Sequence, residues 1–74
     1  MDIQTLIYFV DIAEQHSLSA AAESQNISQS SLSKAIMRLE NELNVHLFDR
    51  KKHPIELTPA GECFYEDVKK MLPN

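Results

Sequence analysis

Residues 17–43 read SLSAAAESQNISQSSLSKAIMRLENEL and carry two helix patterns with a turn signal between them. Ser19 is a natural N-cap for a helix that opens with Ala20–Ala22, and small side chains let a neighbouring helix approach closely. Asn26 can adopt the left-handed conformation that ends a helix, and Ser28 can cap the helix that follows. The stretch therefore predicts two helices packed at short distance and joined by a tight turn.

The second of these helices has an apolar face that predicts how it packs. Ile27 and Leu32 are spaced to form a hydrophobic staple at its start. We expect the helix to reach about Glu42 and to end in a left-handed turn at Asn44. Its inward positions recur at the helical period and are Leu32, Ala35, Ile36, Leu39 and Leu43.

The opposite face of the same helix is rich in hydrogen-bond donors and cations and carries no acidic residue. Its members are Gln29, Ser30, Ser33, Lys34, Met37, Arg38 and Asn41. Glu40 and Glu42 come near the C-terminal end, where the helix dipole makes anions less favourable. We therefore expect them to pair with Arg38.

The segment before this pair of helices predicts another helix. Asp2 can cap a helix over Ile3–Gln15. Its apolar stripe consists of Ile3, Leu6, Ile7, Val10 and Ala13, widened by Phe9 and Ile12.

The segment after them predicts a small hairpin and a last helix. Two short apolar runs, Val45–Asp49 and Ile55–Leu57, flank a basic stretch and indicate a hairpin with a basic tip. Thr58 followed by a proline is a strong helix start, so we expect a helix over Pro59–Leu72 that Pro73 stops. The complete order is helix, helix, turn, helix, hairpin, helix, a mainly α fold.

Length and composition exclude several classes of protein. The chain has 74 residues, enough for one small domain but not for two domains with a cleft between them. Its single glycine excludes the glycine-rich phosphate loops of nucleotide-binding enzymes. No stretch is long and apolar enough to span a membrane, and the N-terminus does not resemble a signal peptide, so we expect a cytoplasmic protein.

No catalytic or metal site emerges from the remaining reactive residues. The three histidines and Cys63 lack the spacing of zinc ligands, and we expect Cys63 to pack near the core. One glycine does not allow a nucleophile elbow. We therefore expect neither enzyme activity nor a cofactor.

Charge is segregated along the chain although the net charge is -4. Residues 1–27 contain four acidic residues and no lysine or arginine, whereas residues 28–53 contain five of the seven basic residues and have a net charge of +2. Such segregation can direct a polyanion to one face of an acidic molecule. An ordinary solvated surface is the alternative interpretation.

Taken together, these residues resemble the LysR-type transcriptional regulators, and the similarity covers the chain from end to end without gaps. The matching positions are Leu6, Phe9, Val10, Ala13, Ser17, Leu18, Ala21, Ala22, Ser28, Gln29, Ser33, Ile36, Leu39, Glu40, Leu43, Leu47, Phe48, Arg50, Leu57, Thr58, Pro59, Ala60 and Gly61. The resemblance implies a winged helix-turn-helix over residues 1–58, with a three-helix core and a hairpin wing. Residues 59–74 would begin a linker helix that dimerises the protein.

The resemblance also implies roles for individual residues. The recognition helix would read double-stranded DNA in the major groove through Gln29, Ser30, Ser33 and Lys34, with Arg38 on a phosphate. The wing residues Arg50, Lys51, Lys52 and His53 would contact the flanking backbone or minor groove. Phe64, Val68 and Met71 would supply part of a homodimer or tetramer seam, with packing against the first helix as the alternative. A small-molecule effector would bind only a C-terminal domain that these 74 residues lack, so we expect the chain to be a fragment.

Three positions depart from the family pattern. Ser30 stands where the family usually has proline, which adds a donor and removes a rigid helix start. Asn44 replaces the usual glycine but is compatible with a left-handed turn. Gln25 replaces the usual leucine, which should make the hydrophobic core slightly smaller. The fold prediction is unaffected by these changes.

The sequence therefore predicts sequence-specific binding of duplex DNA by a dimeric, nucleoid-associated transcriptional regulator. The competing hypothesis is a winged-helix module that has become a protein-interaction or dimerisation domain. The acidic net charge favours that alternative, because DNA affinity depends on neutralising phosphates.

Overall fold

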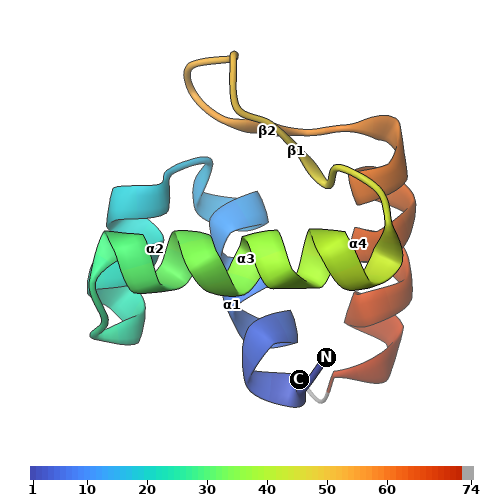
Figure 1. The fold of residues 1–74 in the computed structure, drawn as a ribbon, viewed down its shortest axis with the longest axis horizontal. Coiled ribbons are helices and arrows are strands. Elements are labelled where there is room, and N and C mark those ends of the chain that lie inside the picture. The colour runs from blue at the N-terminus through green and yellow to red at the C-terminus, as the bar shows by residue number, and fades with distance from the viewer. Residues whose placement is uncertain (73–74) are drawn as a thin grey trace.

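Over residues 1–72, the part of the chain that the computed structural model describes, the protein forms four helices and a two-stranded antiparallel hairpin (Figure 1). The elements are α1 (Ile3–Gln15), α2 (Leu18–Gln25), α3 (Gln29–Leu43), β1 (Phe48–Asp49), β2 (Glu56–Leu57) and α4 (Pro59–Met71). The predicted order is thereby confirmed, although the predicted stop at Pro73 lies outside the described residues. None of the described helices is long and apolar enough to cross a bilayer.

Each helix begins at a side chain that accepts a hydrogen bond from a first-turn amide. Three of these caps were predicted and are Asp2, Ser28 and Thr58. The prediction for α2 was wrong, because Ser17 rather than Ser19 accepts from the amide of Ala20, at 3.0 Å. The earlier start includes Leu18 in the helix, where its side chain packs against the core.

Three helices end in residues with left-handed backbone conformation. Asn26 and Asn44, with φ of 58° and 57°, confirm the predicted turns. His16 ends α1 in the same way, with φ of 54°, which the sequence did not indicate. Its Nδ1 donates to the carbonyl of Ile55 at 3.1 Å. This hydrogen bond ties the end of α1 to the segment that leads into β2.

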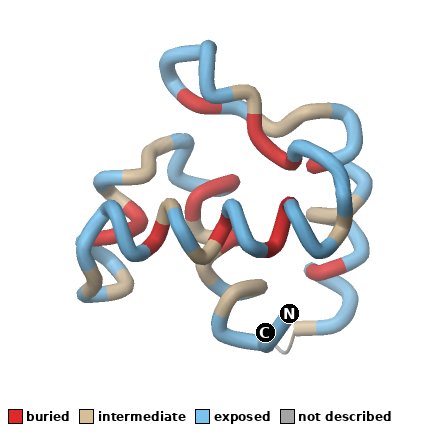
Figure 2. The backbone as a smooth tube through the Cα atoms, viewed as in Figure 1, coloured by how far each residue is buried: buried red, intermediate tan, exposed pale blue. Residues whose placement is uncertain are grey.

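The core lies between the helices and the base of the hairpin, as Figure 2 shows by the buried segments in red. Its fully buried larger members are Phe9, Ile12, Leu32, Ile36, Leu39, Leu47 and Val68. The apolar stripe predicted for α1 was partly wrong, since Ile3 and Ile7 are 60% and 37% exposed. The aromatic ring of Phe9 lies at a tilted angle to Phe48 and edge-on to Phe64, with ring centroids 5.4 and 5.2 Å away.

The strand ends and the start of α4 are held together at one point. β1 pairs with β2 in the register Phe48 with Leu57 and Asp49 with Glu56. The Thr58 hydroxyl donates to the carbonyl of His46 at 2.6 Å, and its amide donates to the carbonyl of Leu47 at 3.0 Å. Gly61 lies against the same carbonyl, so closely that a Cβ there would come within 2.0 Å of the Leu47 oxygen. The only glycine of the chain is thus required by a close backbone approach.

A polar cluster fastens α4 to α1 on the surface. The Tyr65 hydroxyl and the Lys69 ammonium both donate to Oε2 of Glu14, at 2.6 and 3.2 Å. The hydrogen bond from Tyr65 lowers the pKa of the Glu14 carboxyl, and Lys69 acts in the same direction. The same bond raises the pKa of the Tyr65 hydroxyl. Since both charged groups are about half exposed, the cluster orients α4 more than it stabilises the fold.

Candidate nucleic-acid interface

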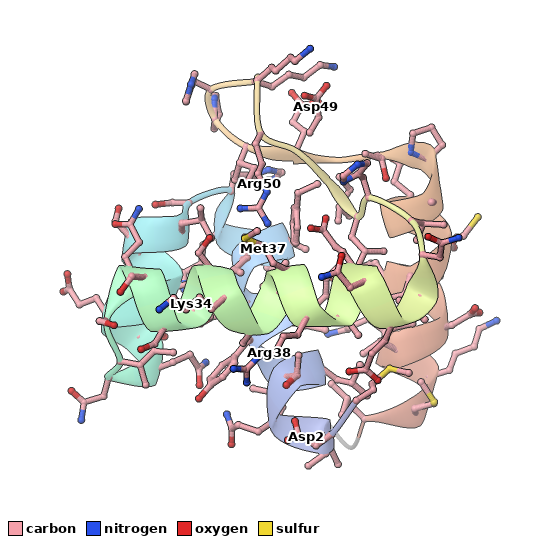
Figure 3. The ribbon with its side chains drawn as sticks, viewed as in Figure 1. Asp2, Lys34, Met37, Arg38, Asp49 and Arg50 are labelled. Carbon is pink, nitrogen blue, oxygen red and sulfur yellow. The ribbon has the colours of Figure 1, made fainter. Side chains whose placement is uncertain are left out.

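The outer face of α3 is exposed where the sequence predicted it to be. Of the predicted contact residues on this helix, Gln29, Ser30, Lys34 and Arg38 are exposed and Ser33 is half-buried. Figure 3 shows Lys34 on the front of α3, with Met37 toward the hairpin and Arg38 on the opposite side. Within residues 1–72, Lys34 and Arg38 take part in no ion pair. Their charges are thus available to an external anion.

The start of α3 is also suited to anions. The Ser28 hydroxyl accepts from the amide of Ser31 at 3.1 Å and satisfies one of the free amides of the first turn. No acidic side chain lies in that turn. The remaining first-turn amides and the positive end of the helix dipole therefore face outward without a competing carboxylate.

The wing is the hairpin β1–β2 with the turn between its strands. Lys51, Lys52 and His53 lie in this turn and are exposed. The turn is shaped by Asp49, whose Oδ1 accepts from the amide of Lys51 at 3.1 Å. Lys52 lies 3.7 Å from Glu56, but both side chains are more than half exposed, so the pair is weak.

Glu40 connects α3 to the wing and was not recognised in the sequence. Its side chain is buried, with 7% of the residue exposed. Oε2 accepts from the amides of Leu47 and Phe48 at 2.7 and 3.3 Å, and Oε1 accepts from Arg50 at 3.3 Å. The predicted pairing with Arg38 was therefore wrong for Glu40. It was also wrong for Glu42, which lies 2.7 Å from the N-terminal amine.

Arg50 lies at the base of the wing and reaches back to α3 (Figure 3). Besides its contact with Glu40, it donates to the hydroxyl of Ser33 at 3.3 Å. The side chain is 36% exposed. The guanidinium thus joins the wing to the outer face of α3, whereas the sequence placed Arg50 with the basic tip.

Four predicted contact residues line one hollow of about 280 Å³ between the starts of α2 and α3 and the wing. They are Gln29, Arg50, Lys52 and His53. The lining includes the cationic Arg50 and Lys52 and no acidic residue, so an anion fits its chemistry better than a cation. No group of three or more His, Cys, Asp or Glu side chains within residues 1–72 is arranged to hold a metal ion.

The residues predicted as a dimer seam lie in different environments. Val68 is fully buried and Phe64 packs edge-on against Phe9, so both side chains belong largely to the core of this chain. The dimer role was therefore wrong for Val68. Met71 is 61% exposed, and its contact with a second copy of the chain remains a prediction. Cys63 is exposed as well, contrary to the expectation that it packs near the core.

Comparison with known proteins identifies relatives of the whole region. The family model described as "Bacterial regulatory helix-turn-helix protein, lysR family" matches residues 3–62. The transcriptional regulator BudR of Klebsiella aerogenes is 46% identical over 72 residues, which cover 97% of this chain and 50% of BudR. The regulator BenM of Acinetobacter baylyi is 39% identical over 74 residues, which cover 100% of this chain and 24% of BenM. The chain thus spans half or less of the length of these relatives.

Solved structures agree with the sequence comparison. The BenM DNA-binding domain in complex with catB site 1 DNA superposes with a TM-score of 0.93 and 38% identity, covering 96% of this chain and 76% of that one. Full-length CbnR in complex with its target DNA superposes with a TM-score of 0.88 and 38% identity, covering 96% and 25%. The similarity confirms the winged helix-turn-helix fold.

Proposed function

Because this chain belongs to the LysR family of bacterial helix-turn-helix regulatory proteins, we propose that it binds duplex DNA sequence-specifically and regulates transcription. The observation that carries the proposal is the exposed outer face of α3, which presents donors and two cations without an ion-pair partner among residues 1–72, while Glu40 is turned into the fold. The relatives it matches are named as transcriptional regulators, which are not enzymes. Its site of action would be the nucleoid in the bacterial cytoplasm.

In the proposed complex α3 enters the major groove with its N-terminal end first. The groove is about 12 Å wide and accepts one helix. Gln29 is suited to a bidentate contact with adenine, and Lys34 to guanine or a phosphate. Ser30 and Ser33 bond to bases or phosphates, and Arg38, farther along the helix, contacts the backbone.

The wing acts beside the recognition helix. Lys51, Lys52 and His53 at its tip contact the flanking backbone or the minor groove. Arg50 holds the wing at a fixed distance from α3 and offers the exposed part of its guanidinium to a phosphate. The wing therefore positions the protein, while α3 reads the sequence.

Salt titration with two substitutions tests this division. Binding to a fluorescent duplex should weaken with salt, with a log–log slope of about -3 to -6 for a dimer, since each contacted phosphate contributes about 0.9. Gln29→Ala should relax preference at one base position by about 1 to 3 kcal/mol and leave the slope unchanged. Lys52→Ala should weaken binding to all sequences alike and make the slope less steep. Fluorescence anisotropy over a panel of duplexes measures both quantities.

Ser24→Ala is a matched control, because Ser24 is exposed on α2 and is not one of the residues assigned to DNA. It should change neither the slope nor the preference. Equal effects of Gln29→Ala and Lys52→Ala across the panel would contradict the division between reading and positioning. A flat salt response, or no binding at low salt, would favour a protein-interaction module instead.

The functional unit that we propose is a homodimer, or a tetramer built from dimers, joined through α4. The exposed side of this helix is acidic at Glu62, Glu66 and Asp67 and basic at Lys69 and Lys70. Two antiparallel copies would place the acidic half of each helix beside the basic half of the other, with Met71 supplying apolar contact. In this proposal the winged helix-turn-helix covers residues 1–58, and the linker helix begins at residue 59. A small-molecule effector would act through a further domain, outside residues 1–74.

A two-fold dimer makes a geometric prediction about the binding site. Selection of bound duplexes from a random pool should return inverted half-sites whose centres lie about 10 to 10.5 base pairs apart, or a multiple of that spacing. The reason is that two symmetry-related helices enter the same side of the duplex one or more turns apart. Single half-sites, or direct repeats without a fixed spacing, would contradict the dimer.

A further inference from the structure

Met37 is an exposed apolar side chain in the middle of the face proposed to read DNA. Its exposed fraction is 51%, and among the exposed large hydrophobic side chains of residues 1–72 it is the one on α3. A single exposed apolar residue is common on protein surfaces and needs no explanation by itself. Its position and its neighbours make it informative here.

The helical period places Met37 with the proposed base-reading residues. It follows Lys34 by three positions and Ser33 by four, so the three side chains are neighbours on the helix surface. At 1.5 Å per residue, Met37 lies about 12 Å along the helix from Gln29. In the proposed complex the outer face of α3 lies against the base edges, so the major groove also covers Met37, which shares that face with Ser33 and Lys34.

The surroundings of Met37 leave room for an apolar group of the DNA. Its side chain lines a hollow of about 610 Å³ between α3 and the wing, together with Phe48 and Arg50. In Figure 3 it points from α3 toward the wing, near Arg50. A methionine side chain has several rotatable bonds and a polarisable sulfur, so it adapts to a contact of modest size.

The chemistry of Met37 differs from that of its neighbours. Ser30, Ser33, Lys34 and Arg38 all bear hydrogen-bonding or charged groups, whereas methionine has no donor and only a weak acceptor. The apolar feature that the major groove offers is the C5-methyl group of thymine. We propose that Met37 contacts this methyl group and makes the protein prefer thymine at one position of each half-site. The inference rests on the proposed function, because it requires α3 to lie in the major groove.

Removal of single methyl groups from the DNA tests the contact directly. A duplex recovered by selection from a random pool is resynthesised with each thymine replaced in turn by deoxyuridine, which lacks only the C5-methyl. Deoxyuridine at one thymine of each half-site should lower the affinity of the protein about fourfold, because burial of one methyl group contributes about that factor. Met37→Ala should bind the unmodified duplex about fourfold more weakly and should be insensitive to deoxyuridine at that position. Met37→Leu should remain sensitive.

Val45→Ala provides the matched control, because Val45 is 42% exposed and lines a hollow beside Met37 without lying on α3. It should keep the full response to deoxyuridine. Thermal unfolding followed by circular dichroism checks that each variant is folded, and the exposure of Met37 makes a large loss of stability unexpected.

Either of two results with the deoxyuridine duplexes would overturn the inference while leaving the proposed function standing: no thymine whose methyl group matters, or a methyl dependence that persists in Met37→Ala. If Met37→Ala binds every duplex with the same affinity as the wild type, Met37 does not contact the thymine methyl group, and the inference is likewise wrong. If selection returns no preferred sequence at all, the proposed function fails, and the contact with thymine fails with it.

Discussion

Gly61→Ala should lower the free energy of unfolding by about 3 kcal/mol, because the new methyl group has no space. Its Cβ would lie 2.0 Å from the carbonyl oxygen of Leu47, which is backbone and cannot rotate away. The start of α4 would have to move, and the hydrogen bond from the Thr58 amide to the same carbonyl would be strained. A domain of this size has only about 4 to 11 kcal/mol of stability, so the loss is a large fraction. Urea denaturation followed by circular dichroism measures it.

Cys63→Ala is the control for this substitution. Cys63 is exposed on the same helix two residues farther along, so its replacement should change the stability by less than about 0.5 kcal/mol. A Gly61→Ala variant as stable as the wild type would show that α4 can shift away from Leu47 at no cost, contrary to the close packing described.

Glu40→Ala should affect both stability and DNA binding. The variant leaves the amides of Leu47 and Phe48 without their acceptor inside the fold, which should cost about 3 kcal/mol. It also removes the anion that holds Arg50 at the base of the wing. The wing then loses its fixed position beside α3, so affinity should fall on all sequences alike and the salt dependence should become less steep. Glu40→Gln should lose less stability, since its amide oxygen still accepts a hydrogen bond.

The matching control is Glu42→Ala, which removes a carboxylate two residues away on the same helix. Glu42 is about half exposed and pairs with the N-terminal amine, so its effect should be small on both measurements. If Glu40→Ala binds DNA with unchanged affinity and unchanged salt dependence while folded, Glu40 does not position the wing.

Much of the fold could be predicted because helix boundaries depend on local chemistry. Asp2, Ser28 and Thr58 are caps by virtue of their own side chains and the amides one turn ahead. The choice between Ser17 and Ser19 could not be made in this way, because both serines are good caps. Packing of Leu18 against the core favours the earlier start, and that contact is not local.

The connection between α3 and the wing was missed for a related reason. Glu40 follows Ile36 by four positions and precedes Leu43 by three, so the helical period places it on the inner face. That signal was present in the sequence, but a carboxylate is rarely buried unless it is paired. Its partners, Leu47, Phe48 and Arg50, lie seven to ten residues farther along. Glu40 was expected to pair with Arg38 because Arg38 is close in sequence, whereas the actual partners of Glu40 lie farther along the chain.

The two faces of α3 have a consequence for how this protein can diverge. The contacts that keep the helix in place come from its inner side, through Leu32, Ile36, Leu39 and Glu40. Gln29, Lys34 and Met37 on the outer side are exposed. Under the proposed function, exchange of these outer side chains would change the preferred DNA sequence with little loss of stability. Ser33 is the exception, because its hydroxyl also accepts a hydrogen bond from Arg50. A substitution at Ser33 would therefore change both the proposed DNA contact and the position of the wing.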